Sequence, residues 1–279
     1  MKFKLVSDSS SNVLEFTDIP FESVPLKIIT EEKEYVDDAN LDVAAMVEDL
    51  RTVKGKTGTS CPNVSEYLDA FEGAENVFVV TITSNLSGSC AAAIQAAAEY
   101  EETHEGAHVH VVDSLSTGAE MRLILEHMRE RILAGDSFEQ VRDSVREYQK
   151  NTHLLFSLQS LANLARNGRV SPAVAKLAGV LGIRILGMAS DEGTLQPLHK
   201  CRGEKKMLDT MVEEMISRGF NGGKVRITHC LNMESALELK TRLLAKFPAV
   251  DISIEPSTGL CSFYAERGSV MVGFEGSLA

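Results

Sequence analysis

The feature that most constrains this fold is a buried strand that passes through a hydroxyl-rich turn directly into an alanine-rich helix. The apolar run Val77–Val80 precedes the turn Thr81–Ser89, and alanine dominates Cys90–Ala98. A strand followed directly by a helix places the linking turn at the carboxyl edge of a sheet, where ligands bind in open α/β folds. Free N–H groups at a helix start favour an anion. The turn therefore predicts a carboxylate or phosphate site, with a simple helix cap by Ser87 as the alternative.

Two further strands end in similar turns. The strand Phe3–Val6 leads into Asp8–Asn12, and His108–Asp113 leads into a turn that ends at Gly118. Each segment alone is also typical of an ordinary turn in which side chains bond to nearby backbone. Because the carboxyl ends of parallel strands gather at one edge of a sheet, we expect the three turns to converge on a polar cleft.

The strands and helices alternate through about residue 150, which predicts a mostly parallel sheet. The second half differs, because the turn Asp191–Thr194 joins the strand Ile183–Met188 to Leu195–Leu198 as an antiparallel hairpin. We therefore expect an α/β protein of two domains, 1–150 with a parallel sheet and 151–279 with a mixed sheet.

Several local elements follow from the same patterns. We expect one strand over Val24–Thr30, a loop over Lys54–Asn63, and a helix over Leu41–Val53 capped by Asn40. The loop lacks the residue order of a phosphate-binding P-loop, so nucleotide binding there is rejected. The small, apolar segment 173–181 predicts a buried helix.

Composition excludes several classes of function. The net charge of −12 argues against binding to nucleic acids and against binding to an anionic membrane surface. Five dispersed cysteines without a CxxC pair indicate a reducing compartment and no zinc ribbon. The start of the chain lacks a signal-peptide core, and no apolar run is long enough to span a membrane. We expect a cytoplasmic protein.

Catalytic and metal signatures are missing. No Gly-x-Ser-x-Gly elbow is present, and Ser84 and Ser87 have no base nearby in the sequence. His108 and His110 share one strand face but lack further ligands, so we interpret them as lying at a solvated sheet edge or as a pair that faces a helix, and we expect no metal site. The turns suit the holding of an anion, and the alternative is an enzyme that acts on a small carboxylate or phosphate at the same cleft.

Several motifs occur together in one order, and jointly they resemble the DegV family of bacterial fatty-acid-binding proteins. They cover nearly the whole chain. The motifs are Ser7-Asp8-Ser9-Ser10-Ser11, Thr59-Ser60-Cys61-Pro62, Thr83-Ser84-Asn85-Leu86-Ser87-Gly88-Ser89, Val112-Asp113-Ser114, Arg166-Asn167-Gly168-Arg169-Val170-Ser171 and Leu198-His199-Lys200-Cys201-Arg202-Gly203-Glu204-Lys205-Lys206.

The resemblance implies a two-domain DegV-like fold that holds a long-chain fatty acid in a tunnel between its domains. It implies that Thr59 or Ser60, together with Ser84, binds the carboxylate. Such proteins present the acyl carboxylate to a fatty acid kinase, and the docking arginine of the family matches Arg202. The chain is then a carrier that has no cofactor and is not an enzyme.

The chain departs from the family pattern at two places in the expected site. Cys61 stands where the family usually has glutamine, and Tyr264 stands where it usually has histidine. Tyr264 can donate a hydrogen bond to a carboxylate, but it offers no positive charge near neutral pH. Since each buried CH₂ group contributes about 0.8 kcal/mol, we expect the tunnel walls to carry the binding. The segment 173–181 and Ile183–Met188 are the walls that we expect.

Overall fold

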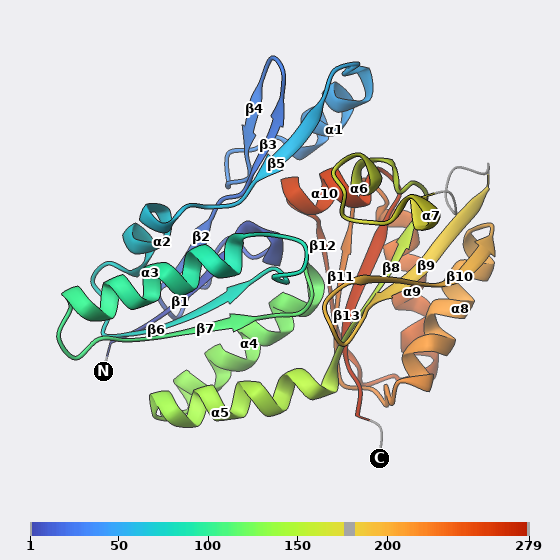
Figure 1. Cartoon of the computed structure of the whole chain (residues 1–279). Coiled ribbons are helices and arrows are strands. Elements are labelled where there is room, and N and C mark those ends of the chain that lie inside the picture. Colours follow the sequence, from blue (N-terminus) through green and yellow to red (C-terminus); the bar gives the residue numbers. More distant parts are fainter. Residues whose placement is uncertain (1, 176–181, 278–279) are drawn as a thin grey trace.

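The computed structural model describes residues 2–175 and 182–277, and it contains two large sheets that lie side by side (Figure 1). The first is a parallel sheet with the strand order β2-β1-β6-β7. Its strands, in that order, are Phe21–Val24, Phe3–Asp8, Asn76–Thr81 and His108–Asp113. This arrangement confirms the parallel sheet expected from the alternation of strands and helices.

Helices cover both faces of the parallel sheet. Along β6, Phe78 and Val80 pack under α4 and α5, while Val77 and Val79 pack under α2 and α3. Successive side chains of a strand point to opposite faces, so an unbroken apolar run is what a sheet covered on both sides requires. The helices are α2 (Val64–Phe71), α3 (Ser89–Thr103), α4 (Ala119–Leu133) and α5 (Phe138–Tyr148).

The second sheet has six strands in the order β10-β9-β8-β13-β11-β12 and is mixed, as expected. Only the β11–β12 pairing is parallel among its five neighbour pairs. In sheet order, the strands are Leu195–Arg202, Ile183–Ala189, Thr152–Leu158, Val270–Glu275, Lys224–His229 and Asp251–Pro256.

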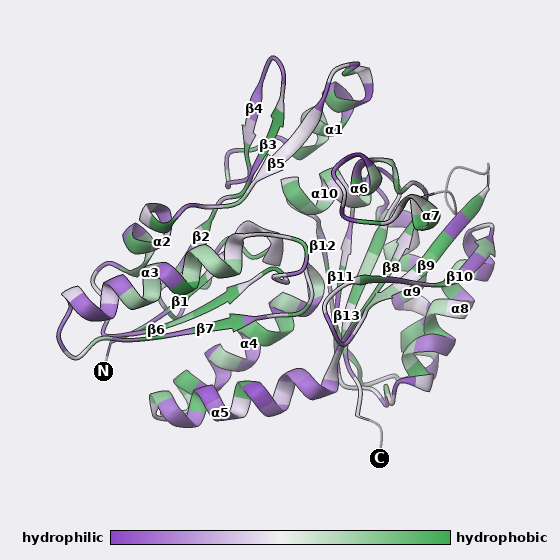
Figure 2. Cartoon of the chain, viewed as in Figure 1, coloured by the Kyte–Doolittle hydropathy of each residue, from purple (hydrophilic) through white to green (hydrophobic). Residues whose placement is uncertain are grey.

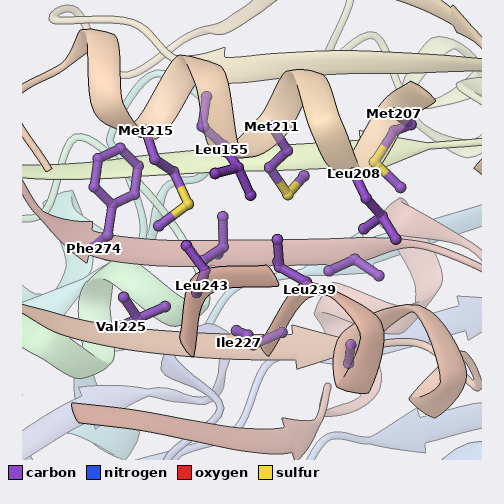
Figure 3. Close-up of a cluster of buried hydrophobic side chains, with 14 of the residues drawn as sticks. Leu155, Met207, Leu208, Met211, Met215, Val225, Ile227, Leu239, Leu243 and Phe274 are labelled. Carbon is purple, nitrogen blue, oxygen red and sulfur yellow. The ribbon is translucent and has the colours of Figure 1, made fainter. Parts of the chain in front are cut away.

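The two faces of the mixed sheet have different neighbours. Leu155, Val225 and Phe274 point toward α8 (Glu204–Ser217) and α9 (Met233–Lys246), with which they form a close-packed apolar core (Figure 3). The alternate residues of these strands face the parallel sheet and the short helices α6 (Ala162–Arg166) and α10 (Gly259–Ala265). In Figure 2, strands such as β6 are hydrophobic along their length, whereas outer helices such as α5 combine hydrophilic and hydrophobic residues.

A small third sheet, β4-β3-β5, projects from the molecule beside α1 (Val43–Thr52) (Figure 1). Its strands are Glu34–Val36, Lys27–Thr30 and Thr57–Ser60. The single strand expected over Val24–Thr30 was wrong, because Pro25 separates β2 in the large sheet from β3 in the small one. Proline has no N–H to donate to a ladder, so the chain changes sheets there.

Two other local expectations also need correction. The segment expected to be a loop contains β5, which pairs with β3 through Thr59 and Ile28. Helix α1 is capped by Asp42, whose carboxylate accepts the N–H of Ala45 at 2.9 Å, and not by Asn40. Of the helix expected at 173–181, residues 176–181 lie outside the described residues, and the helix α7 spans Pro172–Ala175.

Helix α4 joins the two large sheets. It packs against β13 and β11 of the mixed sheet as well as against its own sheet. Arg226 on β11 is buried and donates to Glu126 on α4 at 2.7 Å and to Asp251 at 2.9 Å. The chain then passes from α5 through the turn Gln149–Asn151 into β8. No helix in the described part of the chain is long and apolar enough to cross a membrane.

Candidate ligand-binding site

A cavity of about 280 Å³ lies between the carboxyl edge of the parallel sheet and the mixed sheet. One wall carries hydroxyl groups from three segments of the N-terminal part: Thr59, Ser60, Thr83, Ser87, Ser116 and Thr117. The opposite wall is apolar and comes mainly from the strands β8 and β13, with one residue from α6: Leu154, Phe156, Leu158, Met271 and Leu164. A ligand with a polar head and an apolar body fits this division.

The turns after β6 and β7 converge on the cavity, as the sequence predicts. Thr83 and Ser87 come from the first turn, and Ser116 and Thr117 come from the second. The two turns are joined directly, because the N–H of Thr83 donates to the carbonyl of Ser116 at 2.9 Å. The parallel topology thus brings hydroxyl groups that are distant in sequence to one edge.

The third turn, Asp8–Asn12, lies behind the cavity wall and supports it. The Asp8 carboxylate accepts hydrogen bonds from the N–H of Ile82 at 2.9 Å and from the hydroxyl of Ser89 at 2.6 Å. It also accepts the N–H and the hydroxyl of Ser10. Burial raises the pKa of Asp8, and these four hydrogen bonds oppose the rise. Asp8 therefore fixes both ends of the turn that follows β6.

Three of the four residues predicted to bind a carboxylate come together at the cavity. Thr59 and Ser60 on β5 line it, as does Tyr264 on α10. The hydroxyls of Thr59 and Tyr264 lie 2.7 Å apart and form a hydrogen bond across the cleft. The replacement of the family histidine by tyrosine thus keeps a hydrogen-bonding group at the polar end.

Ser84 is not brought to the cavity. It is exposed, and its backbone N–H donates to the Asp113 carboxylate at 3.2 Å. The neighbouring side chain of Asn85 donates to the carbonyl of Glu192 at 2.5 Å. The same turn instead contributes Thr83 and Ser87 to the lining.

Ser87 fits both interpretations of its turn. Helix α3 begins at Ser89, with Gly88 at the N-cap position and no side-chain cap there. The hydroxyl of Ser87 accepts the N–H of Ser89 at 3.3 Å, so it does serve the helix start. It also lines the cavity. The helix-cap interpretation and the site interpretation therefore describe one side chain with two contacts.

Arg169 lines the cavity, although the sequence identifies it only as part of a motif shared with the DegV family. Its guanidinium lines the cavity and donates through Nε to the carbonyl of Leu86 at 3.1 Å. Within the described residues it forms no ion pair with a carboxylate of the chain. Arg169, the last residue of the Arg-Asn-Gly-Arg motif, therefore brings to the lining a positive charge that Tyr264 does not supply.

The Cys261 thiol at the cavity is not an activated nucleophile. Burial raises the pKa of Cys261 to about 12, and its Sγ donates to the carbonyl of Ser10 at 3.3 Å. A thiol with that pKa stays protonated near neutral pH and is a poor nucleophile. Cys61 is half-buried and lies close to Gly88. Its place at the wall is that of a small lining residue.

Arg202 lies away from the cavity at the end of β10, which is the edge strand of the mixed sheet. Its side chain is exposed, as are those of Lys200, Lys205 and Lys206. None of these four forms an ion pair with another described residue. They form a basic cluster on a protein of net charge −12.

The paired histidines of β7 pack against aromatic rings. His108 lies 5.6 Å from the ring of Phe138 on α5, and His110 lies 6.0 Å from Phe78. Both interpretations describe part of the arrangement, because β7 is the edge strand with His108 exposed, and the His108 ring faces Phe138 on α5. Over residues 2–175 and 182–277, no group of three or more His, Cys, Asp or Glu side chains is placed to hold a metal.

Comparisons with known proteins give consistent matches over the whole chain. The family model described as "Uncharacterised protein, DegV family" matches residues 2–276. A DegV domain-containing protein of Streptococcus pneumoniae is 40% identical over 279 residues, which cover 99% of each chain.

Two similar solved structures contain fatty acids. A DegV family protein of Eubacterium eligens, loaded with heptadecanoic acid, has a TM-score of 0.97 and 41% identity, and the match covers 99% of this chain and 100% of that one. The Fatty Acid Kinase B3 protein of S. pneumoniae, loaded with linoleic acid, has the same TM-score with 40% identity and the same coverage. The arrangement of a parallel and a mixed sheet is therefore shared with proteins whose structures hold fatty acids.

Proposed function

Because this chain belongs to the DegV family, we propose that it binds one long-chain fatty acid in the cavity between its two large sheets and presents the carboxylate to a fatty acid kinase. The observation that carries the proposal is the division of the cavity into a hydroxyl-lined wall and an apolar wall. The fatty acids in the structures from E. eligens and S. pneumoniae consist of a polar carboxylate and an apolar chain, which correspond to these two walls.

We assign the head group to the polar wall. Thr59, Ser60 and Tyr264 would donate hydrogen bonds to the carboxylate, with Thr83 or Ser87 in the place expected of Ser84. Arg169 would balance the charge from the same wall. A carboxylate taken out of water needs such partners, because an unpaired buried charge is strongly destabilising.

The acyl chain would supply most of the binding free energy. A chain with on the order of a dozen CH₂ groups, each contributing about 0.8 kcal/mol, brings roughly 10 kcal/mol before the costs of association. Leu154, Phe156 and Met271 offer the apolar surface for it. We expected Ile183–Met188 to form a wall, but none of these residues is part of the lining. The next residue, Ala189 at the end of β9, does line the cavity.

The same lining supports a carrier that is not an enzyme. Among the described lining residues, no histidine, aspartate or glutamate is present to act as a general base.

We also place the protein in the cytoplasm. All five cysteines are free thiols, which suits a reducing compartment.

Identification of the bound ligand tests the proposal directly. The protein purified from bacterial cells is analysed by native mass spectrometry, and its organic extract by gas chromatography. We expect one fatty acid per chain. A protein that carries no lipid, and whose delipidated form does not bind linoleic acid on titration, would overturn the proposal; turnover of a small carboxylate or phosphate would replace it with the enzymatic alternative.

The kinase role is tested separately at the basic cluster. We expect Arg202→Ala to retain linoleic acid while it loses about tenfold in phosphorylation of that acid by a purified bacterial fatty acid kinase with ATP. Lys246→Ala, at the exposed end of α9, is the control that removes a distant positive charge. Loss of lipid by Arg202→Ala, or equal loss of phosphorylation in both variants, would contradict a docking role for this arginine.

A further inference from the structure

The short helix α10 forms much of one side of the cavity. Leu260, Cys261, Tyr264 and Ala265 all line it. The helix spans only the seven residues Gly259–Ala265. So short a helix is not stable by itself in water, so its orientation depends on contacts made by other segments.

The start of α10 is held by a buried carboxylate from the N-terminal part of the chain. Asp37, which follows β4, accepts the N–H of Gly259 at 2.5 Å and the N–H of Leu260 at 2.9 Å. Its side chain is buried, with a relative exposure of 1% for the residue. The N–H of Asp37 in turn donates to the carbonyl of Leu26, another cavity residue, at 2.9 Å. Asp37 thus joins two lining segments.

The residue before the helix is held from the same side. Thr258 donates through its N–H and its hydroxyl to Oδ1 of Asn12, each at 2.8 Å. Asn12 has a φ of 58°, which is uncommon for a residue other than glycine, and it ends the Asp8–Asn12 turn. The turn that did not reach the cavity therefore takes part in placing α10.

The contact between Asp37 and the helix leaves no spare room. A Cβ atom at position 259 would lie 2.7 Å from Oδ1 of Asp37 and 2.5 Å from Cδ2 of Leu41. Glycine is the residue that allows this approach, because it has no Cβ. The close approach gives the carboxylate direct control of the position of the first turn.

Asp37 is a costly group for the fold to keep. No lysine, arginine or histidine among the described residues forms an ion pair with it. Burial raises its pKa to about 6, although hydrogen bonds from Leu260, Ser9, Gly259 and Thr258 oppose the rise. A buried carboxylate without a positively charged partner, directed at a helix start, needs a reason other than the strength of an ion pair.

We propose that Asp37 is the positioning residue for the fatty-acid head group: it fixes the start of α10 and so holds the Tyr264 hydroxyl at the polar wall beside Thr59. This inference rests on the proposed function of the cavity. The Tyr264 hydroxyl is 2.7 Å from Thr59, so a shift of α10 by an ångström would break that contact.

A double-mutant cycle on linoleic acid affinity tests the inference. Asp37→Asn keeps the size of the side chain but presents one acceptor in place of two, and we expect about tenfold weaker binding. Tyr264→Phe removes the hydroxyl and is expected to weaken binding about fivefold. If Asp37 acts through Tyr264, the double variant binds about as weakly as Asp37→Asn alone; independent effects would give about fiftyfold and would overturn the inference.

A matched control and a second variant separate positioning from general damage. Ser137→Ala removes the capping hydroxyl of α5, far from the cavity, so it should lower stability but leave the affinity unchanged. Gly259→Ala retains the carboxylate but pushes the helix away from it, and it should weaken binding to an extent similar to Asp37→Asn. If Asp37→Asn does not fold, Gly259→Ala provides the cycle with Tyr264→Phe.

Failure of the inference and failure of the proposed function give different results. If the unaltered protein does not bind linoleic acid, the proposed function is wrong. If it binds, and Asp37→Asn and Gly259→Ala bind equally well, the cavity binds lipid without help from Asp37 and only the positioning role is overturned.

Discussion

The two walls of the cavity are stabilised in different ways. The polar wall is a set of turns and one short helix that are held by hydrogen bonds to buried carboxylates, chiefly those of Asp8 and Asp37. The apolar wall consists of alternate residues of regular strands, such as Leu154 and Phe156 on β8. It is held by close packing and needs no buried polar partner.

This difference follows from what each wall has to present. A strand in a sheet already has its backbone hydrogen bonds satisfied, so its side chains can all be apolar. Turns that direct hydroxyl groups at a ligand leave backbone N–H groups free, and a buried carboxylate can accept several of them at once. We therefore expect the polar wall to fail through lost hydrogen bonds and the apolar wall to fail through cavities.

The largest effect is expected at Asp8. Asp8→Ala leaves the N–H of Ile82 and the hydroxyl of Ser89 without their buried acceptor. We expect the free energy of unfolding of the delipidated protein to fall by about 3–5 kcal/mol, as for other buried charged networks that lose one partner. Urea denaturation followed by circular dichroism measures it.

The matched change in the apolar wall is Met271→Ala, which should cost about 2–3 kcal/mol because it leaves a partly collapsible cavity. The two variants differ in a second way. Asp8→Asn should recover a good part of the loss, since it retains an acceptor oxygen. An Asp8→Ala variant as stable as the unaltered protein would show that the polar wall does not depend on this carboxylate.

Glu120 lies where α4 meets β8, and its burial makes the stability of the fold depend on pH. It lies at the start of α4, accepts the hydroxyl of Thr152 at 2.8 Å, and has its pKa raised by burial to about 7 from 4.5. Between these values the folded protein binds the extra proton, so this contribution to stability is complete below about pH 4.5 and is lost as the pH rises through 7.

Glu120→Gln should remove that loss. We expect the variant to exceed the unaltered protein by about 2–3 kcal/mol in free energy of unfolding at pH 8, and to match it near pH 4.5. Urea denaturation at a series of pH values measures the difference. If the free energies of unfolding of the variant and of the unaltered protein differ by the same amount at every pH, Glu120 does not titrate between pH 4.5 and 7 in the folded protein.

Chain-length preference should belong to the apolar side alone. Ala189→Phe, at the end of β9, adds a ring to the lining and should weaken stearic acid more than myristic acid, by about 1–2 kcal/mol, as expected for one or two displaced CH₂ groups. Competition between the two acids for the delipidated protein measures the ratio. An equal loss for both acids would place Ala189 outside the path of the acyl chain.

The sequence was sufficient for the parts of the molecule that follow simple periodicities. The apolar run Val77–Val80 predicted a buried strand, which the structure shows covered on both faces, and the hairpin at Asp191–Thr194 predicted the mixed sheet. The small sheet was predicted only in part. The strand expected over Val24–Thr30 contains β3, but β5 lies in a segment expected to be a loop, because the glycine and proline of Lys54–Asn63 are typical of loops.

The site was predictable in part for a related reason. Convergence of the turns after β6 and β7 follows from parallel topology, so hydroxyl groups at that edge were expected. Which residue of a turn points inward is set by backbone angles and tertiary hydrogen bonds, such as the one from Ser84 to Asp113. The roles of Asp37 and Arg169 depend on contacts between distant segments. Arg169 was noted only as part of a family motif, and no local pattern in the sequence marks Asp37.

The smallest effect is expected at the hydroxyl of Thr59, and it separates the two walls most sharply. Thr59→Val keeps the shape of the side chain and removes one hydrogen bond to the head group, which should weaken binding by about 1 kcal/mol, or about fivefold. Because the head group is the same for every fatty acid, the loss should be equal for myristic, palmitic and stearic acid. Ser84→Ala is the control, and its exposed position predicts no change in affinity. A loss for Thr59→Val that grows with chain length would mean that β5 contacts the acyl chain, and that the polar wall is not confined to the head group.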